Sequence, residues 1–160
     1  MVEPARQRPY LVRRATWQED QAALIAIRRR VFVHEQGVPE DEEWDGHDAS
    51  AVHLIAETGD GVAMGTARVL PTGQIGRMAV LREHRGGGVG QALLEAALAA
   101  IAEQGWPRPF LNAQTAALGF YQQAGFVSQG SVFLDAGIPH RQWCCGLATT
   151  RHSARPRTCF

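Results

Sequence analysis

Lysine is absent from the chain, and all 16 basic residues among its 160 residues are arginine. A P-loop binds nucleotide phosphates with a lysine and a serine or threonine that follow its last glycine. The chain does contain a glycine-rich segment at residues 85–91 (RGGGVGQ), but its last glycine is flanked by valine and glutamine. The sequence therefore excludes the P-loop class of nucleotide site.

Cysteine is scarce, with three residues, and two of them, Cys144 and Cys145, are adjacent. Adjacent residues of a strand point to opposite faces, so we do not expect this pair to form a disulfide or to share a metal ion. His47 and His53 lie near several carboxylates in the sequence, but their spacing matches no recognised metal motif. We expect no bound metal.

The chain also lacks an excess of charge, because 16 acidic residues balance the 16 arginines. This balance provides no global field that would attract nucleic acid. No N-terminal segment resembles a signal peptide, and no apolar run approaches the roughly 18 residues that span a membrane. We expect a cytoplasmic protein that binds neither nucleic acid nor membrane.

The length is typical of one domain with a single buried core. Prolines and charges fill residues 1–9, and residues 149–160 are polar and rich in arginine, so both segments are predicted to be flexible tails. The predicted domain is residues 10–148.

Apolar periodicity and turn residues indicate the order of elements in this domain. We expect strands at residues 10–15, 51–57, 62–70, 75–80, 110–112, 126–134 and 142–147. Helices are expected after Thr16, which forms a capping box with Glu19, from the glycine-rich segment to about residue 104, and over residues 115–124. This order predicts an α/β (α+β) fold, a mixed sheet with helices on both faces.

The succession of strand, glycine-rich turn and helix is suited to binding phosphate. Glycine adopts positive φ, and the unpaired N–H groups at a helix start attract an anion together with the helix dipole. A dinucleotide fingerprint needs a third small residue, where this chain has Gln91 or Leu93. The pattern that remains is Arg-x-x-Gly-x-Gly, at Arg85, Gly88 and Gly90. The alternative is a surface turn that caps an ordinary core helix.

This pattern resembles the acyl-CoA pyrophosphate loop of the GNAT superfamily of N-acetyltransferases. Residues 120–126 (FYQQAGF) are similar to the Phe-Tyr-x-x-x-Gly-Phe segment of that family, and residues 30–39, 45–48 and 137–140 resemble its ElaA-like group. The resemblance covers residues 10–148 and implies a largely antiparallel sheet of six to seven strands. The pair Gly86–Gly87 departs from the common loop pattern and makes this loop more flexible.

The resemblance implies acetyl-CoA as co-substrate and assigns the residues that hold it. In this family one edge of the fourth strand pairs with pantetheine, a backbone N–H there binds the thioester oxygen, and the loop holds the pyrophosphate. The implied CoA contacts are Met78, Ala79, Val80, Arg85, Gly86, Gly87, Gly88, Val89, Gly90, Gln91, Asn112 and Tyr121. Tyr121 is also the implied proton donor to the leaving thiolate. The alternative for Tyr121 is a core tyrosine whose hydroxyl bonds the backbone.

An attacking ammonium must lose a proton, and four residues qualify by type as the base: Glu35, Glu43, His53 and His140. We favour Glu35 and His53, because the end of the first helix and the middle of the second strand line the acceptor side of this fold. The acidic run at residues 40–43 is interpreted as a solvated loop or as an attractor of cationic amines. Residues 28–30, three arginines, are expected to form a solvated helix face rather than a nucleic-acid site.

The favoured function is acetyl transfer from acetyl-CoA to an amine of a small molecule or peptide, by direct attack in a ternary complex. One alternative is a non-catalytic acyl-CoA-binding regulator on the same fold, and another is an unrelated phosphate-binding module. A homodimer is possible. Fold analogy does not identify the acceptor amine.

Overall fold

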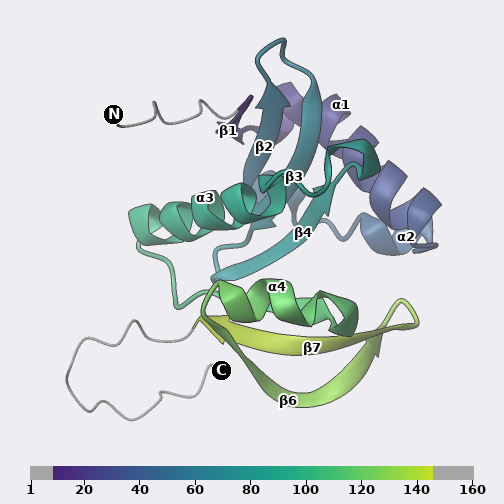
Figure 1. The fold of residues 1–160 in the computed structure, drawn as a ribbon, viewed down its shortest axis with the longest axis vertical. Helices are drawn as coiled ribbons and strands as arrows, with labels where there is room; N and C mark the ends of the chain where they lie inside the picture. Colours follow the sequence, from purple (N-terminus) through teal and green to yellow (C-terminus); the bar gives the residue numbers. More distant parts are fainter. Residues whose placement is uncertain (1–8, 146–160) are drawn as a thin grey trace, which may run out of the picture.

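The structure, a computed structural model, describes residues 9–145, so the predicted tails and Cys159 lie outside the described residues except for residue 9. The fold is built on a seven-stranded sheet in the order β1-β2-β3-β4-β5-β7-β6 (Figure 1). Only β4 and β5 pair in parallel, and every other neighbouring pair is antiparallel. The predicted mixed, largely antiparallel sheet is confirmed.

The elements follow the predicted order. The strands are β1 Tyr10–Ala15, β2 Val52–Thr58, β3 Ala63–Val69, β4 Gln74–Val80, β5 Phe110–Gln114, β6 Phe126–Asp135 and β7 Ile138–Cys145. The helices are α1 Trp17–Arg28, α2 Glu40–Glu43, α3 Val89–Gln104 and α4 Leu118–Gln123, with a π-helix, η1, at Arg29–Glu35. Short 3-10 turns occupy Asp48–Ser50, Arg82–His84 and Thr115–Ala117. None of the helices within the described residues is long and apolar enough to cross a membrane.

The start of α1 bears out half of the predicted capping box. The Glu19 backbone N–H donates to the Thr16 hydroxyl at 3.2 Å, as expected. The carboxylate that reaches back to the Thr16 N–H, at 3.0 Å, belongs to Asp20 rather than to Glu19. Asp20 is also held by Arg13 of β1 at 2.8 Å, and this ion pair fixes its carboxylate over the helix start.

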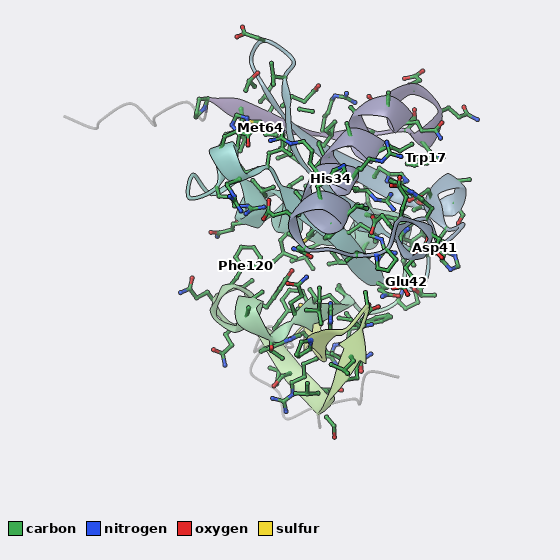
Figure 2. The ribbon with its side chains drawn as sticks, turned by 90° about the vertical axis from the view of Figure 1, so that its right-hand side faces the viewer. Trp17, His34, Asp41, Glu42, Met64 and Phe120 are labelled. Atoms are coloured by element: carbon green, nitrogen blue, oxygen red, sulfur yellow. The ribbon has the colours of Figure 1, made fainter. Side chains whose placement is uncertain are left out.

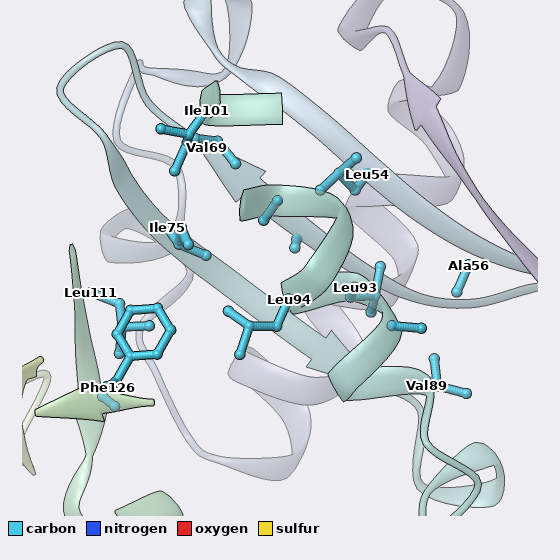
Figure 3. Packing of buried hydrophobic residues seen from close by; sticks show 14 of the residues in the cluster. Leu54, Ala56, Val69, Ile75, Val89, Leu93, Leu94, Ile101, Leu111 and Phe126 are labelled. Atoms are coloured by element: carbon cyan, nitrogen blue, oxygen red, sulfur yellow. The ribbon is translucent and has the colours of Figure 1, made fainter. Parts of the chain in front are cut away.

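Helices cover both faces of the sheet, as predicted. α3 lies across β2, β3 and β4, with Leu93, Leu94 and Ile101 buried against residues such as Leu54 and Val69 (Figure 3). α1 and η1 cover the opposite face. The buried residues of that layer are Leu24, Ile27, Val31, Ile55, Ala79 and Leu81.

The parallel strands β4 and β5 separate soon after they start. They pair only at Gln74–Phe110 and Ile75–Leu111, although β4 is seven residues long. On its other side β4 stays paired with β3, but the register shifts beside Arg77, whose φ of 48° lies in the left-handed region. The sheet is therefore split between β4 and β5, and β4 carries a bulge at the split.

The last strand begins earlier than the sequence indicated. β7 starts at Ile138 rather than at residue 142, and it includes Pro139. Pro139 pairs only with β6, because the ladder to β5 begins at His140. Proline is tolerated at such edge-like positions, where no ladder to a second neighbour depends on its missing N–H.

Candidate functional site

A cavity of about 320 Å³ lies where β4 and β5 diverge. Its walls come from these two strands, from η1 and the segment after it, from α2, from α4 and from the β6–β7 hairpin. The polar residues that line it are Gln36, Glu42, Glu43, Arg68, Gln74, Arg77, Asn112, Gln114, Tyr121, Asp135 and His140. Figure 2 shows Glu42 on the side of α2 and Phe120 on the side of α4.

The glycine-rich loop ends in an uncapped helix start. Gly86 and Gly88 have φ of 84° and 83°, a conformation that favours glycine. α3 begins at Val89 without a side-chain cap, and its first recorded backbone bond runs from Ala92 N–H to Gly88 C=O at 3.1 Å. The Tyr10 hydroxyl donates to Gly87 C=O at 3.3 Å and steadies the loop from β1. The N–H groups of the first turn are thus available to an anion.

The side chain of Arg85 is committed within the protein. Its Nε donates to Val80 C=O at 2.9 Å, and its two Nη atoms bind the Glu35 carboxylate at 2.7 and 3.1 Å. The predicted contribution of Arg85 to phosphate binding therefore has to come from its backbone and its remaining N–H groups.

Glu35 does not face the cavity, so the expectation that it lies on the acceptor side is wrong. It closes η1 and points to Arg85. The bound guanidinium of Arg85 lowers the pKa of the Glu35 carboxyl below its usual value. A carboxylate stabilised in this way is a poor proton acceptor.

His53 is buried, with 1 % of its surface exposed, and it does not line the cavity either. The alternation of β2 turns it to the α1 face, where its ring stacks on Trp17 at 5.3 Å and its Nε2 lies 2.8 Å from Asp48 C=O. Burial lowers the pKa of the imidazole, which favours the neutral ring. The expectation that His53 faces the acceptor is therefore wrong, and the structure gives it the place of a core histidine.

Tyr121 lines the cavity. Its ring packs against Phe126 and Trp143, and its hydroxyl is 3.9 Å from the sulfur of Met78 on β4. Burial raises the pKa of the phenol to about 12. No backbone group accepts its hydroxyl within the described part of the chain, so the core alternative for Tyr121 lacks its expected bond.

The strand residues around the cavity differ in exposure. On β5 the consecutive residues Leu111, Asn112, Ala113 and Gln114 all line it; Asn112 is the exposed one, whereas Leu111 and Ala113 are buried. On β4, Met78 lines the cavity, whereas Ala79 packs with Ile27 of α1. Val80, the third β4 residue expected to contact CoA, packs at the edge of the main core.

His140 and Glu43, the base candidates that we did not favour, are the two that line the cavity. His140 Nδ1 lies 2.7 Å from Ile138 C=O, and since a carbonyl only accepts, Nδ1 carries the hydrogen. In the neutral ring Nε2 then has a free lone pair, and no side chain or backbone group among residues 9–145 bonds it.

Glu43 is buried, with 2 % exposed, in a network of charges rather than in a solvated loop. Its Oε1 accepts from Arg28 at 2.7 Å and lies 3.2 Å from Arg77, while Oε2 has no hydrogen-bond partner in the described structure. Burial raises the pKa of the Glu43 carboxyl, against the opposing charges of Arg77 and Arg28.

Arg28 corrects the expectation of a solvated arginine face, because it is 1 % exposed. It binds Asp48 at 2.6 Å as well as Glu43, and its guanidinium lies over the ring of Trp44 at 5.0 Å. The network continues through two more arginines and one more carboxylate, Arg68, Arg77 and Asp45. The sequence held a signal for this: Arg28 follows Leu24 by four residues and so falls on the buried stripe of α1.

Replacing Arg28 by methionine should lower the free energy of unfolding by about 3–5 kcal/mol, because it leaves buried carboxylates uncompensated. Urea unfolding followed by circular dichroism measures the change. Arg30→Met is the matched control, since Arg30 makes a comparable pair with Glu83 at the surface and should cost less than about 1 kcal/mol. Equal costs in the two variants would contradict a structural role for the network.

The described side chains include no cluster of three His, Cys, Asp or Glu residues placed to hold a metal ion. The site combines an uncapped helix start after a glycine-rich loop, a split sheet with a free strand edge, a buried phenol and a cavity lined by carboxylates.

Comparisons with known proteins agree with this arrangement. The family model described as acetyltransferase (GNAT) domain matches residues 15–144. The chain is 40% identical over 119 residues to the uncharacterized N-acetyltransferase YjcF of Bacillus subtilis, covering 72% of this chain and 85% of YjcF. Among solved structures, an acyl-CoA N-acyltransferase from Pseudomonas aeruginosa superposes with a TM-score of 0.75 at 30% identity, over 84% of this chain and 98% of the other. Escherichia coli ElaA superposes with a TM-score of 0.74 at 30% identity, with the same coverage. The chain thus belongs to the GNAT family of acetyltransferases.

Proposed function

We propose that the protein transfers the acetyl group of acetyl-CoA to a cationic primary amine by direct attack in a ternary complex. The observation that carries this proposal is the split between β4 and β5. It opens a cavity whose rim holds the free edge of β4, the phenol of Tyr121 and three carboxylates. A phosphate-binding module alone has no need of such a cleft.

Acetyl-CoA fits the two features that it would contact. The uncapped N–H groups of Val89, Gly90 and Gln91 suit the pyrophosphate. Beyond Ile75, β4 has no partner on the β5 side, so its backbone there is open to the pantetheine amides. Asn112 lines the same cavity from β5 and supplies a side-chain amide for hydrogen bonding.

The reaction requires charge stabilisation on the thioester oxygen and a proton for the leaving sulfur. The bulge at Arg77 and Met78 interrupts the ladder between β4 and β3, and we assign stabilisation of the developing oxyanion to a backbone N–H of β4 at this bulge. Tyr121 keeps its proton near neutral pH because burial raises its pKa to about 12. It can therefore protonate the thiolate as that group leaves.

The acceptor is assigned to the α2 side of the cavity. The cavity is lined by three carboxylates, those of Glu42, Glu43 and Asp135. Its two arginines, Arg68 and Arg77, are already paired with carboxylates. We assign binding of the ammonium to the free Oε2 of Glu43 and removal of its proton to Nε2 of His140. These roles replace the expected ones of Glu35 and His53.

CoA should bind and stabilise the fold, since a ligand at about 100 times its dissociation constant adds about 2.7 kcal/mol. Gly88→Val and Gly90→Val should abolish this shift in melting temperature, because a branched side chain at either position crowds the N–H groups. Gly59→Val, in the β2–β3 turn with nothing near its Cβ, is the matched control. Normal binding of CoA to both loop variants would refute the phosphate assignment.

Release of free thiol from acetyl-CoA in the presence of a panel of amines tests the transfer itself. The panel should include 1,4-diaminobutane, benzylamine and an N-terminal peptide amine. Turnover with a cationic amine supports the proposal. Tight CoA binding without turnover on any of them would favour the non-catalytic regulator.

A further inference from the structure

Two consecutive residues, Glu35 and Gln36, connect the two strands that the split separates. Glu35 is bound to Arg85, which in turn holds Val80 C=O at the end of β4. The Gln36 Oε1 accepts from Gln114 Nε2, at the end of β5, at 2.7 Å. The carboxyl ends of β4 and β5 are the open mouth of the split, so this pair of contacts spans it. We call Glu35 and Gln36 the clasp.

The clasp joins the phosphate-binding loop to the acceptor side of the cavity. Arg85 is the first residue of the loop, and Gln36 and Gln114 both line the cavity. Arg85 uses one N–H on Val80 and one from each Nη on Glu35, and a guanidinium has five N–H groups in all. Arg85 can therefore keep Glu35 while it also donates to a bound phosphate.

The clasp lies at the end of η1, and we expect the order of η1 to depend on the contact between Glu35 and Arg85. η1 is a π-helix, a rare and less stable form that is frequent at functional sites. Its end is held by bonds such as Gln36 N–H to Val31 C=O at 3.1 Å. Because the segment has little intrinsic stability, a constraint on Glu35 should reduce its local opening.

We infer that Glu35 is a positioning residue that couples occupancy of the loop at residues 85–91 to the order of η1, so that bound CoA prepares the acceptor side of the cavity. The inference rests on the proposed function, since it takes CoA as the ligand of the loop. It gives Glu35 a role that needs neither contact with the acceptor nor acceptance of a proton.

Amide hydrogen exchange of the full chain, with and without saturating CoA, tests this coupling. In the unaltered protein, CoA should slow exchange in the loop peptide and also, by at least about threefold, in the peptide of residues 29–38. In Glu35→Gln the loop should still be protected by CoA, but residues 29–38 should show no CoA-dependent change.

Glu83→Gln is the matched control, because Glu83 also forms an ion pair with η1, through Arg30, but not through the loop residue Arg85. It removes the same charge near the loop and should leave the CoA-dependent protection of residues 29–38 intact. A purely structural role of Glu35 would raise exchange there equally with and without CoA.

CoA-dependent protection of residues 29–38 that persists in Glu35→Gln would overturn the inference. So would protection of the loop alone in the unaltered protein. If CoA protects neither segment, the assignment of CoA to the loop fails and the proposed function fails with it, which separates the two outcomes.

Discussion

Tyr121→Phe should lower kcat by about 10²–10⁴-fold, the usual contribution of general acid catalysis. The substitution removes only the hydroxyl, and the ring keeps its packing against Phe126 and Trp143. CoA affinity should therefore hardly change, because the thiolate that needs the proton exists only after attack. Steady-state kinetics together with calorimetric CoA binding separate the two effects.

Tyr10→Phe is the matched control, since it removes the hydroxyl of the other tyrosine in the chain. That hydroxyl bonds Gly87 C=O in the loop, so its loss should weaken CoA binding modestly and leave kcat nearly unchanged. A Tyr121→Phe variant with full kcat would return Tyr121 to a packing role.

His140→Gln should lower kcat by about 10²–10⁴-fold as well, because glutamine cannot take the proton of the attacking ammonium. Steady-state kinetics with a cationic amine measures the change. His47→Gln, which alters an exposed histidine outside the cavity, should keep the full rate.

Glu43 should affect the acceptor rather than the rate of the chemical step. Burial raises the pKa of Glu43, so it becomes protonated at a higher pH than an ordinary glutamate. The KM for a cationic amine should therefore rise as the pH falls and Glu43 becomes protonated, because the neutral carboxyl no longer attracts the ammonium. If His140→Gln retains the full rate, the base is another residue or a water chain, and the assignment of His140 is wrong.

The local motifs could be predicted because their physics is local. The turn glycines, the helix start at Val89 and the alternation of β5 are each determined by a few neighbouring residues. The resemblance to the acetyltransferases indicated Tyr121 and Asn112 as CoA contacts, and this assignment stays a prediction. Both line the cavity in the structure.

The acceptor side could not be predicted in the same way, because tertiary contacts decide it. Nothing near Glu35 in the sequence reveals that Arg85, 50 residues away, binds it. The sequence does not show to which face of the sheet the side chain of His53 points. The stacking of its ring on Trp17 places it in the core. Glu43 belongs to an acidic run that is solvated except where Arg28 draws one carboxylate inward. Residue type alone identified the candidate bases. The tertiary packing then showed which of them line the cavity.

The buried charge network restricts how acceptor preference can change in this protein. Arg28, Arg68 and Arg77 face Glu43, Asp45 and Asp48. Four of these six side chains, Arg28, Arg68, Glu43 and Asp48, are buried, so a substitution of one of them leaves a partner unbalanced. Changes at coupled sites of this kind are not additive. An altered specificity at Glu43 is therefore accessible chiefly through paired exchanges with Arg28 or Arg77. In natural descent, as in directed evolution, residues 28, 43 and 77 should change together or not at all.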